Sequence, residues 1–231
     1  MTHDALHICA DMTLRLGRAG DEVSVLVAGV EALMSDDGAR QAAIAACSPQ
    51  RREHALRLRA TRSQALSVGA TLLLDELLRR HSLRERDMTY TIGPHGKPAF
   101  AACKQIAFSL SHSGTMAAAA CLAVSPTDVA RTGLGIDIER KGRYRTELVR
   151  RMFAPADRLR MASARTEEQR QAIFADVWTR TEAYAKATGR GLTWPVQVPP
   201  PEACFHSCDA PDGYRLCVCL CMCEQGVTIT M

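Results

Sequence analysis

The sequence predicts an α+β fold made of two similar halves, each an antiparallel sheet with helices packed on one face. Apolar residues alternate in several segments that are joined by short turns, as is typical of antiparallel strands. A long helix is expected in each half, at 63–80 and at 166–188. A chain of 231 residues is long enough to bury the cores of both halves. We place the seam within 115–130 and take 1–120 and 121–231 as the two domains.

The N-terminal half shows clear signals after residue 46, whereas residues 1–46 give mixed ones apart from a strand at 23–30. Ser48 followed by Pro49 is a typical helix start, because serine caps the helix and proline fits its first turn. After the basic helix that begins there, the pattern predicts a second helix at 63–80, a strand, turn and strand at 88–100, and two strands within 105–124 that meet at Ser113–Gly114.

The C-terminal half begins with a strand at 133–139, followed by short helices at 145–153 and from Pro155. "TEEQ" at 166–169 is a capping box, so the longest helix is expected to start at Thr166. Gly189 is a typical residue for its C-terminal end. A loop rich in proline and two strands forming a hairpin complete the chain.

Composition excludes several classes of protein. The net charge of +4 suits anionic partners but is too weak for a nucleic-acid-binding protein, and 5% aromatic residues make base stacking an unlikely mode of binding. The N-terminus lacks the pattern of a secretory signal. The apolar runs, such as 116–124, are far shorter than the roughly 20 residues that span a bilayer. We therefore expect a cytoplasmic protein that acts as a monomer, without membrane or nucleic-acid partners.

The chain has ten cysteines, and four of them alternate with apolar residues in "LCVCLCMC" at 216–223. Their sulfurs would extend over roughly 20 Å of one strand, whereas a zinc site needs all ligands about 2.3 Å from one ion. Disulfides between neighbours on one face of a strand are disfavoured by their spacing. We expect the thiols to pack as small apolar side chains, with pairing to Cys204 or Cys208 left open.

Asp137 and Glu139 stand one residue apart in "GLGIDIER", which otherwise reads as a buried strand. Residues i and i+2 of a strand project to the same face, about 6.5–7 Å apart. Two carboxylates this close repel each other unless a cation or a donor lies between them. The pattern therefore indicates either a cation site or a solvated face paired with nearby arginines.

Three further stretches carry polar groups suited to an anion. Lys97 in "HGKP" is a point charge presented by a turn. Ser111 and His112 end a strand in "FSLSHSG", where a serine–histidine nucleophile pair is disfavoured because neighbours on a strand face opposite ways. Glu182 and Lys186 are four residues apart on the long helix, a spacing that is equally typical of an exposed salt bridge.

Taken in order, these stretches resemble a known signature. "GKP", "F-x-L-S-H-S", "G-x-D-x-E" and "W-x-x-x-E-A-x-x-K" together are similar to the 4′-phosphopantetheinyl transferases, in particular the larger Sfp-like type, in which one chain works as a pseudo-dimer. The resemblance spans about residues 48–192. It implies transfer of the phosphopantetheine arm of coenzyme A to a serine of an acyl, polyketide or peptidyl carrier protein, with release of 3′,5′-ADP.

The resemblance also implies roles for individual residues. Asp137 and Glu139 become ligands of Mg²⁺, with Mn²⁺ as the alternative ion, and Asp157 stands where the family has a third acidic ligand. Glu182 corresponds to the proposed base and Lys186 to the lysine at the departing phosphate. The coenzyme A contacts are expected from the N-terminal half, at Arg51, His54, Lys97, Pro98, Ser111 and His112.

The chain departs from the family pattern at three positions. Asp157 replaces the usual glutamate, and Thr181 replaces a lysine before Glu182, with Arg180 as a partial substitute. Ala65 stands where an arginine is common, and Arg57, Arg59 and Arg62 are equally typical of a solvated helix face. Asp157 and Thr181 leave open a coenzyme A- or carrier-binding protein without activity, and the C-terminal cysteines leave open a thiol-rich metal or redox protein.

Overall fold

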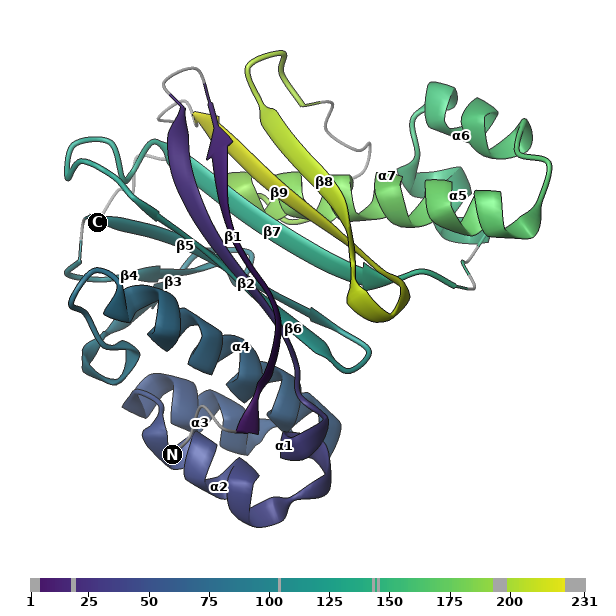
Figure 1. Ribbon diagram of the computed structural model, residues 1–231. Coiled ribbons are helices and arrows are strands. Elements are labelled where there is room, and N and C mark those ends of the chain that lie inside the picture. The colour runs from purple at the N-terminus through teal and green to yellow at the C-terminus, as the bar shows by residue number, and fades with distance from the viewer. Residues whose placement is uncertain are drawn as a thin grey trace.

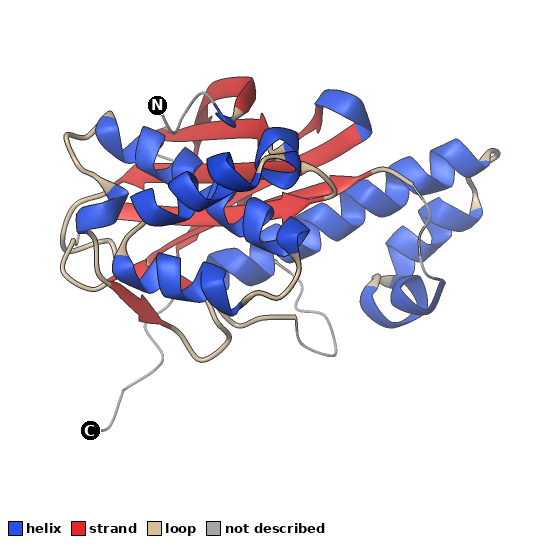
Figure 2. Ribbon diagram, turned by 90° about the horizontal axis from the view of Figure 1, so that it is seen from below, coloured by secondary structure: helices blue, strands red, loops and turns tan. Residues whose placement is uncertain are grey.

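The computed structural model describes residues 5–17, 20–103, 105–142, 144, 146–192 and 199–222. Two antiparallel sheets pack face to face, and each carries helices on its outer side (Figure 1). One group of helices covers the N-terminal sheet, and a single long helix runs along the C-terminal sheet toward two short helices at its far end (Figure 2). The predicted α+β fold of two halves, each a sheet with helices, is confirmed.

The N-terminal sheet has the strand order β1-β2-β6-β5, with every neighbouring pair antiparallel. Its strands are β1 (His7–Leu16), β2 (Asp21–Gly29), β5 (Ile106–Ser113) and β6 (Met116–Ala123). Its helices are α1 (Glu31–Ser35), α2 (Asp37–Ala46), α3 (Pro49–Arg57) and α4 (Thr61–Arg79). A short turn of 3-10 helix (Glu85–Asp87) precedes the small hairpin of β3 (Tyr90–Ile92) and β4 (Pro98–Phe100).

Several predicted features of this half are confirmed. The Ser48 side chain caps α3 by accepting a hydrogen bond from the Arg51 amide, and β5 and β6 meet at the predicted turn. β1, α1 and α2 were not predicted. β1 lies at the edge of the sheet and most of its residues are exposed or half-buried. Its apolar residues do alternate, at Ile8, Ala10, Met12, Leu14 and Leu16, so the sequence held a strand signal that was missed.

The C-terminal sheet has the order β7-β9-β8, from β7 (Thr132–Arg140), β9 (Tyr214–Met222) and β8 (Cys204–Ala210). Its helices are α5 (Thr146–Met152), α6 (Pro155–Ala162) and α7 (Glu167–Thr188). Thr166 and Gln169 form the predicted capping box of α7, and Gly189 ends the helix with φ +67°. That left-handed conformation favours glycine, as predicted.

Alternate residues along the strands pack into two different hydrophobic cores. In β2, Leu26 and Ala28 pack under the N-terminal helices, whereas Val25 and Val27 face the C-terminal sheet. In β7, Ile136 and Ile138 fill the core between the sheets. The opposite face of the C-terminal sheet is therefore the one that α7 covers.

The alternating cysteines of β9 lie on this α7 face. Cys217, Cys219 and Cys221 are buried and pack with small residues of α7, and each is a free thiol, as are Cys204 and Cys208. Burial raises the pKa of Cys217 to about 12, so the thiol stays protonated and unreactive. The predicted role as small apolar packing groups is confirmed for these three cysteines. Cys223 lies outside the described residues.

Gly135 of β7 allows α7 to pack unusually close to the strand. A Cβ atom at this position would lie 1.9 Å from the Ala183 carbonyl oxygen and 2.6 Å from the Ala187 amide nitrogen. Both are backbone atoms of α7, so neither can move aside as a flexible side chain would. Glycine is therefore required here by the close approach of helix and strand.

Side chains, rather than a strand ladder, join the two halves at their seam. The Ile136 amide donates to Ser109 Oγ at 3.0 Å, and the Ile138 amide donates to Ser111 Oγ at 3.3 Å. These contacts bring β5 beside β7 although the two strands belong to different sheets. β6 ends at Ala123 and β7 begins at Thr132, so residues 124–131 link the halves. The division at 120 and 121 stays a prediction.

Replacing Ser109 with alanine is expected to lower the free energy of unfolding by about 1–3 kcal/mol. Ser109 is buried, and Ile136 is fully buried, so the variant would leave the Ile136 amide without its acceptor. Chemical denaturation of the two proteins measures the difference. Equal stability of the variant and the wild type would contradict a structural role for this seam contact.

Among the helices of the described ranges, none is both long and apolar enough to cross a bilayer.

Candidate active site

Asp137 lies at the centre of a polar cluster between the two halves. It is 5% exposed, and its Oδ1 atom accepts hydrogen bonds from Ser111 Oγ at 2.8 Å and Lys186 Nζ at 2.7 Å. Its Oδ2 atom is buried and has no hydrogen-bond partner within the described part of the chain. A buried carboxylate oxygen without a donor is costly, so this atom is suited to a ligand that brings positive charge.

Two more carboxylates share the site. Burial and the charge of Asp137 raise the pKa of Glu139, against the opposing effects of Ser113 and Lys186. Burial and the charge of Asp137 also raise the pKa of Glu182, to which Glu139 contributes while Lys186 opposes. The three acids are thus close enough to repel one another. The predicted placement of Asp137 and Glu139 together is consistent with these interactions.

Lys186 ties α7 to the N-terminal half. Its ammonium group donates to Asp137 Oδ1 and, at 2.9 Å, to Ser111 Oγ. The close contact of α7 with Gly135 brings this part of the helix to the strand that carries Asp137. The i, i+4 pair of Glu182 and Lys186 is therefore directed at the carboxylate cluster and is not a solvated helix face.

The cluster fits a hard divalent cation. Asp137 Oδ2 has no hydrogen-bond partner in the described residues. Burial and, after it, the negative charge of Asp137 raise the pKa values of Glu139 and Glu182, and a cation would offset both effects. In the described residues, no group of three acidic, histidine or cysteine side chains is placed so that it could hold a metal ion by itself. Mg²⁺ suits such a partial set, because in proteins it is held by one or two carboxylates together with substrate phosphates and water.

Asp157 lies in a different network. Its carboxylate pairs with Arg160 at 3.1 Å in the first turns of α6. Arg160 also approaches Asp176 of α7 at 3.8 Å, and Asp176 pairs with Arg215 of β9 at 2.6 Å. These ion pairs anchor α6 to α7 and to the C-terminal sheet. A metal-binding role for Asp157 stays a prediction, and Glu182 is the third acid that the structure brings to Asp137 and Glu139.

A cavity of about 290 Å³ joins the cluster to the turn before β4. Lys97, Pro98, Glu182 and Lys186 all line it, so residues predicted from both halves meet around one space. Lys97 Nζ donates to the Ala187 carbonyl at 2.8 Å and to the Leu134 carbonyl at 3.2 Å. Lys97 thus binds the C-terminal end of α7 and holds the turn against β7.

Among the remaining predicted coenzyme A residues, His54 and His112 lie within the influence of the positive charges of Arg51 and its neighbours. Arg51 is held by Thr71 Oγ1 at 2.9 Å. Burial, then the charges of Lys186 and Arg51, lower the pKa of His112, and burial with Arg51 and Arg57 lowers the pKa of His54. Excess positive charge of this kind favours an anionic ligand.

Arg62 was interpreted from the sequence as part of a solvated helix face, but it makes a specific contact. Its guanidinium donates twice to the Gly114 carbonyl, at 3.0 Å and 2.8 Å, in the turn after His112. No spacing in the sequence indicates this contact, because it depends on where α4 lies against the β5–β6 turn. Ser111 is buried and donates a hydrogen bond to Asp137, and its predicted contact with coenzyme A stays a prediction.

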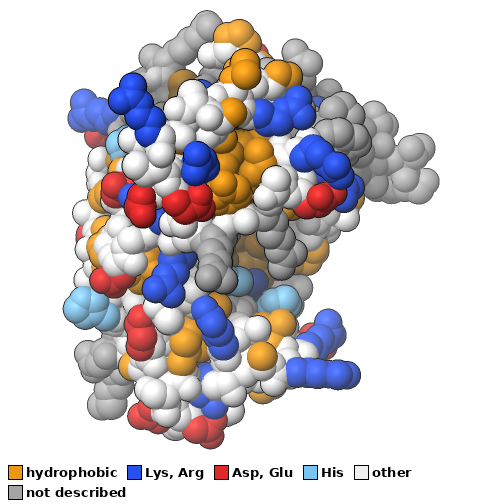
Figure 3. All heavy atoms as spheres, turned by 90° about the vertical axis from the view of Figure 1, so that its right-hand side faces the viewer, with side chains coloured by type: hydrophobic (Ala, Val, Ile, Leu, Met, Phe, Trp, Pro, Cys, Tyr) orange, Lys and Arg blue, Asp and Glu red, His pale blue; other side chains and the backbone are white. Residues whose placement is uncertain are grey.

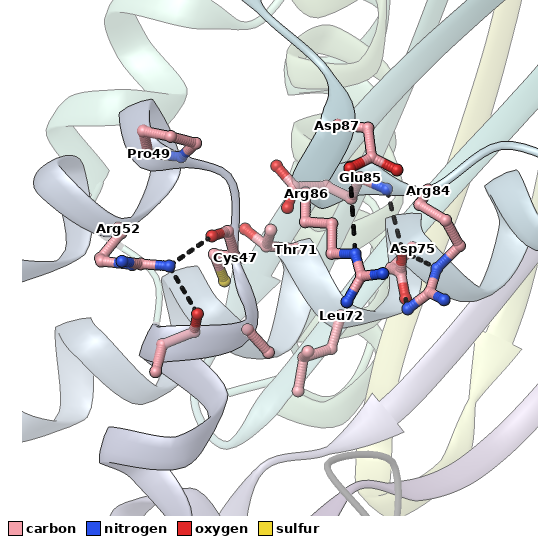
Figure 4. A pocket seen from close by; sticks show the side chains of 12 residues that line it. Cys47, Pro49, Arg52, Thr71, Leu72, Asp75, Arg84, Glu85, Arg86 and Asp87 are labelled. Carbon is pink, nitrogen blue, oxygen red and sulfur yellow. Dashed lines mark hydrogen bonds and ion pairs between the residues drawn. The ribbon is translucent and has the colours of Figure 1, made fainter.

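A larger cavity of about 460 Å³ lies elsewhere, between α3, α4 and the turn at Glu85–Asp87 (Figure 4). Its charged groups bind one another: Asp75 pairs with Arg84 at 3.2 Å, and Glu85 accepts from the Ser48 amide at 2.8 Å. Glu85 also accepts from the Tyr90 hydroxyl at 2.6 Å. This network holds the start of α3 in place and thereby positions Arg51. None of the predicted catalytic residues lines the cavity.

Known proteins are similar in sequence to the region of this chain that contains the site. Residues 133–218, which include the carboxylate cluster, match the family described as the 4′-phosphopantetheinyl transferase superfamily. A 4′-phosphopantetheinyl transferase of Bacillus subtilis is 25% identical over 169 residues, 66% of this chain and 71% of that protein. The transferase AcpT of Salmonella typhimurium is 34% identical over 110 residues, 48% of this chain and 53% of its own length.

A third relative, the transferase Sfp of Bacillus subtilis strain 168, is 25% identical over 150 residues, 64% of this chain and 63% of that protein. The alignments to AcpT and Sfp thus span from about half to just under two thirds of those relatives. The matched region contains Asp137, Glu139, Glu182 and Lys186, the same residues that meet in the cluster. Over residues 133–218 the chain is therefore similar to the 4′-phosphopantetheinyl transferase superfamily.

Proposed function

We propose that this protein transfers the 4′-phosphopantetheine arm of coenzyme A to a serine of an apo carrier protein, releases 3′,5′-ADP and depends on Mg²⁺. The observation that carries the proposal is the meeting of three carboxylates with Lys186, beside a cavity lined from both halves. The match of residues 133–218 to the transferase superfamily supports the same activity.

Asp137 and Glu139 would hold the ion, with Glu182 the nearest further acid. When bound, Mg²⁺ would neutralise charge on the pyrophosphate and orient it. Asp137 contributes the buried Oδ2 atom that lacks a protein donor in the described residues. Mn²⁺ is the alternative ion for an all-oxygen site of this kind.

In the proposed reaction, the carrier serine oxygen bonds to the phosphorus that bears the pantetheine arm. The bond from that phosphorus to the bridging oxygen breaks, and this oxygen leaves on 3′,5′-ADP. Glu182 accepts the serine proton, and its raised pKa makes it a stronger base than an exposed glutamate. Lys186 places its positive charge beside the cluster, where it would stabilise the leaving phosphate.

Coenzyme A would extend from this cluster across the N-terminal half. Lys97 and Pro98 line the cavity beside Glu182 and Lys186, which suits the pyrophosphate and the start of the arm. Arg51 supplies positive charge for the phosphate on the ribose, and His54 and His112, whose lowered pKa values favour the neutral imidazole, would contribute hydrogen bonds. Ser111 would act mainly through Asp137.

Carrier proteins are acidic helical bundles, so a basic face with apolar side chains would suit them. On the face where α5 and α6 lie, Lys and Arg side chains together with a few Asp and Glu side chains border an apolar patch (Figure 3). Leu159 of α6 is 70% exposed, and Arg151 of α5 and Arg158 of α6 are exposed as well. We place the carrier on this face; acyl, polyketide and peptidyl carriers all remain candidates.

The test is intact-mass measurement of apo carrier proteins after incubation with the enzyme, coenzyme A and Mg²⁺, with and without EDTA. We expect a gain equal to one phosphopantetheine arm, which EDTA abolishes and added Mg²⁺ restores. A gain that EDTA does not change would contradict the metal dependence. Coenzyme A binding without any gain on acyl, polyketide or peptidyl carriers would instead favour the non-catalytic binding protein.

A further inference from the structure

The Ser111 hydroxyl is fully engaged at the seam between the halves. Its single proton is donated to Asp137 Oδ1 at 2.8 Å. Its oxygen accepts from the Ile138 amide at 3.3 Å and from Lys186 Nζ at 2.9 Å. A serine hydroxyl has one donor and two acceptor positions. Ser111 therefore uses its whole hydrogen-bonding capacity on the C-terminal half.

These contacts orient the Asp137 carboxylate. Ser111 and Lys186 both donate to Oδ1, so the rotation of the carboxylate is restricted and Oδ2 is left as the free atom. Ser111 lies on β5 and Asp137 on β7, so one half of the molecule sets the orientation of a ligand that belongs to the other. Groups that hold a metal ligand in place tune its affinity for the ion.

Ser109 provides a matched comparison two residues earlier on the same strand. It is buried like Ser111, and its hydroxyl accepts from the next amide along β7, that of Ile136, at 3.0 Å. No described hydrogen bond joins Ser109 to a carboxylate of the cluster. The two serines thus share the seam contact and differ in the contact with Asp137.

We propose that Ser111 is a positioning residue for the metal ligand Asp137, in addition to joining the two halves. The inference rests on the proposed function only in taking Asp137 as a ligand of the divalent ion. It predicts that removing the Ser111 hydroxyl weakens metal binding, whereas removing the Ser109 hydroxyl affects the seam alone.

The experiment measures Mn²⁺ binding by electron paramagnetic resonance, with coenzyme A present, for the full-length wild type and for Ser111→Ala, Ser109→Ala and Ser111→Thr. We expect Ser111→Ala to bind Mn²⁺ about tenfold more weakly and Ser109→Ala to stay within about twofold of the wild type. Ser111→Thr keeps the hydroxyl and should restore most of the affinity. Thermal unfolding of each protein shows that the variants are folded.

Equal Mn²⁺ affinity of Ser111→Ala and the wild type would overturn the proposal, as would an equal loss in both alanine variants or the absence of Mn²⁺ binding by the wild type. If Ser111→Ala does not fold, a Ser111→Thr variant with strongly weakened Mn²⁺ binding would also contradict it. Failure of the proposed function would give a different result from failure of this inference. The wild type would then transfer no arm to any carrier, yet Ser111→Ala would still lower the Mn²⁺ affinity.

Discussion

Replacing Asp137 with asparagine is expected to reduce kcat/KM for phosphopantetheine transfer by about a thousandfold, equivalent to several kcal/mol of transition-state stabilisation. Asparagine keeps the shape of the side chain and an oxygen for Ser111, but it removes the negative charge that would hold the ion. Rates of carrier modification, measured by intact mass over a range of Mg²⁺ concentrations, test this expectation. An unimpaired variant would remove Asp137 from the mechanism.

Asp157→Asn is the matched comparison, since it makes the same chemical change at the third acid predicted from the sequence. Asp157 pairs with Arg160, and no described contact links it to Asp137. We expect its effect on transfer to be at most about tenfold, because the loss of a partly exposed ion pair costs little. A loss as large as that of Asp137→Asn would instead support Asp157 as a direct metal ligand.

Replacing Gly135 with alanine is expected to lower the free energy of unfolding by about 3 kcal/mol or more, the upper part of the range for overpacked cores. The new methyl group would overlap the Ala183 carbonyl oxygen, so α7 has to move away from β7. Because α7 carries Glu182 and Lys186, a shift of about 1 Å should also reduce transfer roughly a hundredfold. Chemical denaturation and transfer rates measure the two effects.

Gly142→Ala is the control for this variant. An added Cβ at Gly142 meets no atom within 4 Å, so its effect on stability should stay within about 0.5 kcal/mol. If Gly135→Ala proved as stable and active as Gly142→Ala, the close approach of α7 to β7 would not be needed to assemble the site.

Local spacing in the sequence was enough to predict the elements that carry the site. A period of two placed Asp137 and Glu139 on one face of a strand, and that strand is β7. The capping box and Gly189 marked both ends of α7, and the i, i+4 spacing placed Glu182 and Lys186 together on it. The alternating cysteines of β9 were predicted to pack as small apolar groups, and three of them do so. These features depend on residues a few positions apart, which the backbone geometry alone brings together.

Contacts between the halves were decided by the tertiary structure. The hydrogen bond from Ser111 to Asp137 was not predicted from the sequence, and it forms because β5 lies beside β7 where two separate sheets meet. Lys97 binds the end of α7, which follows it by ninety positions, and Arg62 binds a turn fifty-two positions away.

The physical reason is the same in each case. A strand or helix pattern shows which side chains share a face, and so the sequence by itself determined the paired acids, the helix that carries Glu182 and Lys186, and the buried thiols. Which faces then meet depends on how two sheets and their helices pack, and on close approaches such as that of α7 to Gly135. Only the folded chain brought the three carboxylates, Lys186 and Ser111 to one place.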